Sequence, residues 1–361
     1  MNKPIFVIIP VYNAERYLEN AVQSVLNQPN VDTQVILVND GSRDSSGEIC
    51  NRLSFSDARI CVVHQENGGV SKARNTGIDL ALEKTMAFGD DAYIAFLDAD
   101  DLWKKNMKWA VDDGEDADII AYSSAYCNAK GNRFCIIHRF ENGIMFGDGA
   151  NTAWVTNGHF GAFLFHAGFL RKNRLRFIEG VIRNEDIIFW KQATFAARKI
   201  VFLSEVLYVY RMHSTSVTHS GSIDHVVSLH IPNAWKQAEK WIHSLPDSTQ
   251  LQKERWTEIC SLLVGTRLLE NVRSLAEYGR STEEIKTVLL NSPLTKHLED
   301  LEVEYLADWQ KSDLLMFRDD FKGFVRFYKK RGRLLRIGIV IRNLPIIREI
   351  IDHRKYSLME I

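Results

Sequence analysis

The sequence predicts an α/β fold in which a mostly parallel sheet is covered by helices on both faces and is followed by a helical C-terminal region. Two patterns predict this fold. In the first hundred residues, short apolar runs alternate with segments whose apolar residues recur at helical spacing. From about residue 223 onward, helical spacing dominates and strand patterns are few. Strands that alternate with helices pair in parallel and are buried on both faces.

Apolar runs bounded by polar residues mark the strands of the N-terminal part. The predicted strands cover residues 5–9, 35–38, 59–63 and 93–97. The predicted helices between them cover residues 14–28, 44–53 and 70–82, and Asn13 is a suitable N-cap for the first. The first apolar run is short, contains Pro10 and lacks a small-residue cleavage site. It therefore indicates a buried strand and not a signal peptide.

Length and charge limit the classes of protein. With 361 residues, 45% of them hydrophobic, the chain can bury a large core, and its net charge of −1 predicts no general attraction to nucleic acid. We expect a catalytic domain over residues 1–222, a helical domain over 223–320 and a basic amphipathic tail over 321–361. The tail has 11 Lys/Arg against 3 Asp/Glu. Every long apolar run is interrupted by charges or proline, so no membrane span is expected.

The cysteines are five in number and scattered: Cys50, Cys61, Cys127, Cys135 and Cys260. An odd number without any C-x-x-C spacing suggests neither a disulfide framework nor a zinc site. This usage fits a protein of the reducing cytoplasm.

Polar segments follow three of the predicted strands. They are residues 10–13 after the first strand, 39–42 after the second and 98–101 after the fourth. In open α/β sheets, ligands bind beyond the carboxyl ends of the strands. These three segments are therefore expected to meet at one binding crevice.

Six motifs in order resemble a family 2 glycosyltransferase of the GT-A (Rossmann-like) fold. They are PVYN (10–13), VNDGSRD (38–44), ENGGVSKARNTG (66–77), FLDADD (96–101), RNEDIIFW (183–190) and YRMHSTSVT (210–218). The motifs span about the first 220 residues. One departure is Asn39, where the family usually has an aspartate. The resemblance implies an inverting, cytoplasmic transferase that uses a sugar nucleotide and a divalent metal, Mn²⁺ or Mg²⁺.

The FLDADD segment is a candidate metal site. Carboxylates at positions i and i+2 after a strand can face one side of a turn, and hard divalent ions prefer oxygen ligands that phosphate oxygens complete. The resemblance makes Asp100 the expected metal ligand and Asp98 a contact to ribose, sugar or metal-bound water. An alternative is a solvated acidic turn that caps a helix beginning near Leu102.

The RNED segment is the candidate catalytic element. A metal can neutralise a leaving nucleoside diphosphate, so the reaction needs one carboxylate base for the acceptor hydroxyl. The resemblance assigns this role to Asp186, with Glu185 as the next candidate. The alternative is a helix N-terminus with favourable acidic residues in its first turn.

The donor-binding residues expected from the motifs are Pro10, Tyr12, Asn13, Asp40, Asn67, Lys72, Arg74, Asp98 and Asp100. Tyr12 can stack on a base or pack in the core. Asp40 can accept a hydrogen bond from a uracil N–H, and the two residues together favour a uridine donor. The resemblance places His213 over the diphosphate as a metal or phosphate ligand, and a structural histidine is the alternative. The roles of four residues around the Gly-Gly turn stay open between contact with phosphate or donor sugar and capping or pairing of the helix: Asn67, Lys72, Arg74 and Asn75.

Two further segments have open interpretations. The aromatic residues between 151 and 177 favour core packing, with Trp154 and His159 as candidates for sugar stacking. The tail resembles an interfacial membrane anchor, and a contact with the acidic remainder of the chain or a partner protein is the alternative.

The expected partners are a nucleotide-sugar donor and a saccharide or lipid-linked acceptor, as in bacterial-type surface polysaccharide assembly, with no nucleic acid. The membrane surface is a further expected partner, which would place the protein on the inner face of the membrane. The alternative function is a sugar-nucleotide or carbohydrate binding protein of the same fold without transferase activity.

Overall fold

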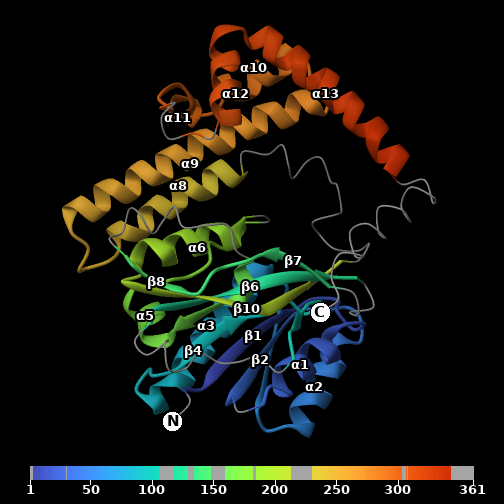
Figure 1. The fold of residues 1–361 in the computed structure, drawn as a ribbon, viewed down its shortest axis with the longest axis vertical. Coiled ribbons are helices and arrows are strands. Elements are labelled where there is room, and N and C mark those ends of the chain that lie inside the picture. Colours follow the sequence, from blue (N-terminus) through green and yellow to red (C-terminus); the bar gives the residue numbers. More distant parts are fainter. Residues whose placement is uncertain are drawn as a thin grey trace. The chain divides into compact units, whose positions relative to one another are not determined.

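The computed structural model describes most of the chain. The described residues are 3–29, 31–105, 117–128, 134–147, 159–181, 184–212, 230–302, 306 and 308–342. The chain divides into two compact units: Met1–Ser216, with which Ile361 is grouped, and Val217–Glu360. Figure 1 shows a sheet with helices in the first unit and helices alone in the described part of the second.

The first unit is built around one sheet. Its strands are β1 (Ile5–Val11), β2 (Thr33–Asp40), β3 (Ile60–Gln65), β4 (Tyr93–Phe96), β5 (Leu102–Trp103), β6 (Ile119–Cys127), β7 (Phe134–His138), β8 (Gly143–Phe146), β9 (Phe163–His166) and β10 (Lys199–Arg211). Its α-helices are α1 (Leu18–Leu26), α2 (Ser46–Ser56), α3 (Val70–Thr85), α5 (Ala167–Lys172) and α6 (Glu185–Ala196). Short 3₁₀ turns, η1 (Met86–Phe88) and η2 (Phe160–Ala162), complete it.

The sheet has the strand order β3-β2-β1-β4-β9-β6-β10-β5, with β7 beside β6 and β8 beside β10. The four strands predicted from the sequence form its parallel part. Strand β9 then runs antiparallel to both β4 and β6, while β10 is parallel to β6. The predicted α/β fold with a helical C-terminal region is confirmed.

Strand β1 is buried on both faces. Ile5, Val7 and Ile9 lie in one apolar cluster with side chains of α1. On the opposite face, α3 approaches so closely that a Cβ at Gly77 would lie 2.3 Å from Cγ2 of Ile8. Burial on both faces explains why the strand is a continuous apolar run instead of an alternating one.

Two local predictions were wrong. Asn13 is not a helix cap, because α1 begins at Leu18 and Asn13 adopts a left-handed conformation with φ 51°. The backbone N–H groups of residues 13–15 donate to side chains of the next loop, so this segment forms a turn instead of a helix. The acidic turn does not cap a helix at Leu102 either, since Leu102–Trp103 is strand β5, paired with β10.

The second unit is described by itself as a group of helices. They are α8 (His230–His243), α9 (Gln250–Glu277), α10 (Thr282–Leu290), α11 (Thr295–Glu299), α12 (Asp308–Asp319) and α13 (Phe321–Arg342). Capping boxes begin α9 at Thr249 and α10 at Ser281. Among the described residues, no helix is both long enough and apolar enough to cross a membrane.

Candidate functional site

The loops after β1 and β2 are joined by hydrogen bonds at the carboxyl ends of the strands. Asn13 donates its backbone N–H to Ser42 Oγ at 3.1 Å, and its Oδ1 accepts from the backbone N–H of Arg43 at 2.8 Å. Pro10 lies within β1 opposite Val38 of β2. Tyr12, next to these bonds, is 47% exposed. The joined loops therefore leave an accessible aromatic ring at this edge of the sheet.

Asp40, at the end of β2, is buried beneath the turn that precedes α3. Its Oδ1 accepts from Gly68 N at 2.9 Å and Gln65 Nε2 at 2.7 Å, and its Oδ2 accepts from Gly69 N at 2.8 Å. The carboxylate thus fixes the Gly-Gly turn from which α3 begins. Its contact with a nucleotide base stays a prediction, because these bonds belong to the turn.

Arg74 of α3 joins two motifs that are far apart in the sequence. Its guanidinium is 6% exposed and donates to Asp98 Oδ1 at 2.8 Å and to Glu185 Oε1 at 2.9 Å. It also lies over the rings of Phe160 and Phe177, at 5.5 and 5.1 Å from their centroids. Burial alone would lower the pKa of Arg74, but the charges of Asp98 and Glu185 outweigh it and raise the pKa. Arg74 therefore stays a cation between the FLDADD and RNED motifs.

The acidic turn contains three carboxylates in different surroundings. Asp98 is 40% exposed, and Asp100 is partly exposed, whereas Asp101 is buried. Asp101 accepts hydrogen bonds from the hydroxyl of Tyr208 and, at 2.7 Å, from the backbone N–H of Arg211. Burial, followed by the charges of Asp100 and Asp98, raises the pKa of Asp101 well above its usual value. Asp101 thus fixes the turn to β10, whereas Asp98 and Asp100 stay partly exposed.

The hydroxyl of Tyr208 lies 3.5 Å from Oδ2 of Asp98, and Arg211 Nε donates to the backbone oxygen of Asp100 at 2.8 Å. The ring of His159 stacks on Tyr208, with centroids 4.8 Å apart. Motif reading missed Tyr208 and Arg211 as site residues. The signal that could have found them is the YRMHSTSVT motif, in which Arg211 is the second residue and which Tyr208 precedes by two positions.

Glu185 and Asp186 occupy the first turn of α6. Asn184 precedes them in a left-handed conformation, φ 64°, which asparagine tolerates better than most residues. Burial, opposed by Arg74 and assisted by the charge of Asp186, raises the pKa of Glu185 to about 7. Burial also raises the pKa of Asp186, against the opposing charge of Arg74. Asp186 as a residue is partly exposed, and its carboxylate accepts from the backbone N–H of Ile187 at 2.8 Å.

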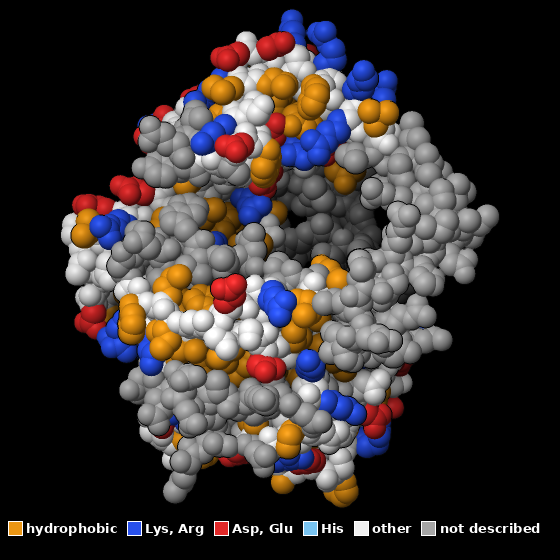
Figure 2. Space-filling view, in the orientation of Figure 1, with side chains coloured by type: hydrophobic (Ala, Val, Ile, Leu, Met, Phe, Trp, Pro, Cys, Tyr) orange, Lys and Arg blue, Asp and Glu red, His pale blue; other side chains and the backbone are white. Residues whose placement is uncertain are grey.

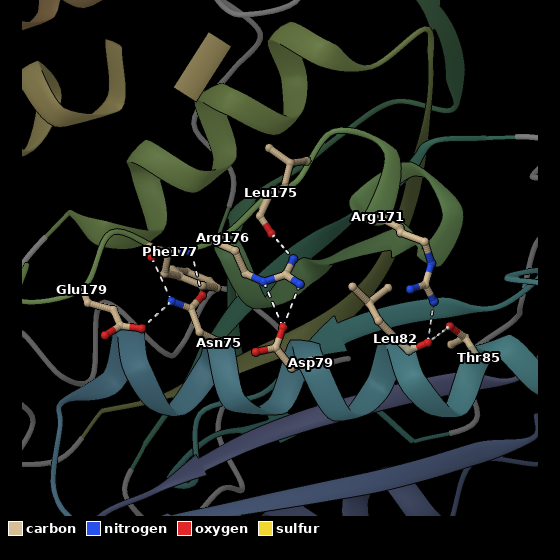
Figure 3. A network of polar contacts seen from close by, with 9 residues as sticks. All are labelled: Asn75, Asp79, Leu82, Thr85, Arg171, Leu175, Arg176, Phe177 and Glu179. Atoms are coloured by element: carbon tan, nitrogen blue, oxygen red, sulfur yellow. Dashed lines mark hydrogen bonds and ion pairs between the residues drawn. The ribbon is translucent and has the colours of Figure 1, made fainter. Parts of the chain in front are cut away.

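Helix α3 also fixes the segment that leads to α6, as Figure 3 shows. Asn75 donates to the backbone oxygen of Phe177 at 3.0 Å and accepts from its N–H at 2.9 Å, so one side chain holds both polar groups of a buried peptide. Arg176 pairs with Asp79 one turn further along the helix. One helix therefore positions the FLDADD turn, through Arg74, and the approach to the RNED motif, through Asn75.

The remaining predicted residues have different outcomes. Asn67 and Lys72 are exposed beside the Gly-Gly turn, and Asn67 donates to the backbone oxygen of Asp40 at 3.0 Å. His213 and Trp154 lie outside the described residues. The aromatic residues at 160, 163, 165, 169 and 177 are buried, so the prediction of core packing is confirmed for them.

The donor set of the acidic turn fits a hard divalent cation. Asp98 and Asp100 supply partly exposed carboxylate oxygens, which Mg²⁺ and Mn²⁺ prefer, and phosphate oxygens and water would complete the coordination. Within the described part of the chain, no group of three or more His, Cys, Asp or Glu side chains is arranged around a metal position. The described residues alone would therefore supply only part of the coordination shell.

Comparison with known proteins identifies the family. The Glycosyl transferase family 2 model matches residues 6–109, which include the first four motifs. The glycosyltransferase GlyG of Streptococcus pneumoniae is 32% identical over 234 residues, which is 60% of this chain and 73% of GlyG. The chain is a family 2 glycosyltransferase. The minor teichoic acid biosynthesis protein GgaA of Bacillus subtilis is 31% identical over 213 residues, which is 57% of this chain but only 46% of GgaA.

Solved structures agree on the fold of this glycosyltransferase. A crystal structure of residues 1–349 of S. aureus TarS in complex with UDP-GlcNAc superposes with a TM-score of 0.63 at 17% identity, covering 92% of each chain. At this identity the likeness concerns the fold alone. It confirms the GT-A fold that the motifs implied.

Proposed function

We propose that this glycosyltransferase moves a sugar, with inversion at the anomeric carbon, from a uridine diphosphate donor to an acceptor hydroxyl. The observation that carries the proposal is the double ion pair of Arg74 with Asp98 and Glu185. Through it, the turn suited to the donor diphosphate and the carboxylates suited to a base belong to one rigid site. A site so built can hold donor and acceptor in reacting geometry.

Asp186 is the proposed general base. Glu185 is engaged by Arg74, whereas Asp186 is a partly exposed residue that accepts from the backbone N–H of Ile187 and forms no ion pair among the described residues. Asp186 takes the proton of the acceptor hydroxyl, the oxygen bonds to the anomeric carbon, and the bond to the diphosphate oxygen breaks. A raised pKa makes Asp186 a better proton acceptor than an ordinary aspartate once it is ionised.

Asp100 and Asp98 are the proposed ligands of Mn²⁺ or Mg²⁺. Such an ion, when bound, would neutralise charge on the leaving diphosphate. Arg74 holds Oδ1 of Asp98, Oδ2 lies 3.5 Å from the Tyr208 hydroxyl, and the Asp98 side chain is 40% exposed. This arrangement supports Asp100 as the direct ligand and Asp98 as a contact to the donor or to metal-bound water.

The uridine assignment is supported by Tyr12, whose exposed ring can stack on a base. The TarS complex with UDP-GlcNAc indicates that this fold accommodates such a donor. The similarity to GgaA supports an acceptor in surface polysaccharide or teichoic acid assembly. We place the reaction in the cytoplasm, where the five unpaired cysteines would remain reduced.

A donor panel tests this function. The full chain is incubated with UDP-, GDP- and dTDP-sugars, each with Mn²⁺, Mg²⁺ or chelator, and hydrolysis and binding are both measured. Metal-dependent consumption of one or more UDP-sugars is expected, and Asp186→Asn should stop consumption. Binding of a UDP-sugar without turnover under any condition would instead identify a binding protein of this fold. Consumption of only GDP- or dTDP-sugars would overturn the uridine assignment.

A further inference from the structure

Helix α13 is fixed in the second unit by one of its sides. Phe324, Val325 and Tyr328 are buried, and Phe324 contacts Phe317 of α12 with ring centroids 5.9 Å apart. The hydroxyl of Tyr328 donates to Asp313 of α12, and the guanidinium of Arg273 from α9 lies 5.1 Å from the Tyr328 ring centroid. These contacts determine which side of α13 faces outward.

The outward side carries cations next to apolar side chains. Lys322, Arg326, Lys330 and Arg333 are exposed and recur every three or four residues, so they form one stripe along the helix. Phe327 and Leu334 are 51% and 61% exposed and, seven residues apart, form a second stripe beside it. Figure 2 shows basic and hydrophobic side chains next to one another where Figure 1 draws α13.

No acidic residue of α13 balances the positive charges of this stripe. Residues 321–342 contain eight Lys and Arg and no acidic residue. Arg331 pairs with Glu277 at 3.5 Å, but in the described part of the chain the four cations of the outward stripe form no ion pair. A partner that complements both stripes of α13 is anionic where it meets the cations and apolar where it meets Phe327 and Leu334.

We propose that this face of α13 binds the surface of an anionic lipid bilayer. The four cations contact the headgroups, and Phe327 and Leu334 enter the boundary between headgroups and acyl chains. A nucleic acid would satisfy the cations and leave the apolar stripe in water, whereas a bilayer offers both environments. Each cation near such a surface strengthens binding roughly fivefold. The binding is independent of glycosyl transfer.

Vesicle sedimentation of the full chain tests the proposal. We expect binding to vesicles of phosphatidylcholine with phosphatidylglycerol, weaker binding at high salt, and none to phosphatidylcholine alone. Replacing the four cations by Gln should weaken binding by a hundredfold or more. Replacing Phe327 and Leu334 by Ala should weaken it about tenfold without changing retention on heparin. All six side chains are exposed, so the variants should keep the wild-type thermal unfolding curve.

The matched control removes four charges elsewhere in the same unit: Lys240, Lys253, Lys286 and Lys296, each replaced by Gln. It should bind anionic vesicles within twofold of wild type. If the control variant lost as much binding to anionic vesicles as the α13 variant, the loss would be a general effect of charge, and the assignment to α13 would be overturned. Unchanged vesicle binding by the Phe327→Ala, Leu334→Ala variant would show that the apolar stripe does not enter the bilayer and would overturn that part of the proposal. Failure of the wild type to bind anionic vesicles, with retention on heparin, would identify a soluble polyanion as the partner instead. Self-association of the wild type that this variant abolishes would identify a second copy as the partner.

Discussion

Arg74 and Glu185 form a buried ion pair with a distance of 2.9 Å, although 111 residues separate them in the chain. The same guanidinium pairs with Asp98, so helix α3 joins the FLDADD turn to the start of α6. Few side chains can replace a cation that is buried between carboxylates, because its loss leaves buried negative charge without a partner.

Replacing Arg74 by Met should lower the free energy of unfolding by about 3–5 kcal/mol, because it leaves two carboxylates without their cation. Arg74→Lys keeps the charge but cannot reach both partners in a fixed geometry, so it should fold and lose most transfer activity. Urea denaturation and a transfer assay measure the two effects. Arg176→Ala removes a more exposed ion pair, which Arg176 forms with Asp79 of α3. Its free energy of unfolding should stay within about 1 kcal/mol of wild type. A stable, fully active Arg74→Met would refute the coupling.

Asp186→Asn keeps the shape of the side chain and removes its basicity. Transfer should fall about a hundredfold or more, while UDP-sugar affinity measured by calorimetry stays within a few-fold of wild type. Asp79→Asn, on the surface of α3, is the control and should leave both quantities unchanged. Near wild-type transfer by Asp186→Asn would move the base assignment to Glu185.

Asp100→Ala should reduce the dependence of UDP-sugar binding on Mn²⁺ and should lower turnover with it, because the variant loses an anionic oxygen ligand. Calorimetry with and without Mn²⁺ measures the difference. Asp91→Ala removes an exposed carboxylate that precedes β4, and it should behave like wild type. An Asp100→Ala enzyme with undiminished metal dependence would contradict the proposed ligand.

Glu185 should make stability depend on pH. Its pKa is about 7 in the folded protein against an ordinary value of 4.5, so the folded state binds more protons between these values. The stabilising contribution of protonated Glu185 is complete below pH 4.5 and is lost as the pH rises through 7. The free energy of unfolding of wild type should therefore fall relative to Glu185→Gln by on the order of 2 kcal/mol between pH 4.5 and 8. If the free energies of unfolding of wild type and Glu185→Gln changed with pH in parallel, this prediction would be wrong.

Asn75→Ala should destabilise the fold by about 2 kcal/mol, because the buried N–H and C=O of Phe177 lose their partner. Since Phe177 precedes the RNED segment, transfer should decline more than donor affinity. Thermal unfolding and steady-state kinetics measure the two effects. Asn173→Ala, which removes a hydrogen bond from Asn173 to the backbone oxygen of Phe169 at the end of α5, is the control. If Asn75→Ala and Asn173→Ala lost equal transfer activity, Asn75 would have no special positioning role.

The sequence by itself determined the α/β pattern, the four parallel strands and the loops that gather at their carboxyl ends. These features follow from local periodicity and from the rule that strands joined by helices run parallel, both of which are encoded within short windows. The order of the six motifs also identified the family. Local pattern failed at Asn13, where bonds to the neighbouring loop replaced the expected helix cap.

Only the tertiary structure decided how the acidic residues differ from one another. In the sequence, Asp98, Asp100 and Asp101 are alike, and so are Glu185 and Asp186. Folding buries Asp101 beneath Tyr208, pairs Asp98 and Glu185 with Arg74, and leaves Asp100 and Asp186 partly exposed. These partners are between 24 and 111 residues apart. The burial of a carboxylate and the distance to the nearest cation decide whether it supports the structure or stays accessible for chemistry. Both depend on how β10, α3 and α6 pack. No local sequence pattern encodes that packing.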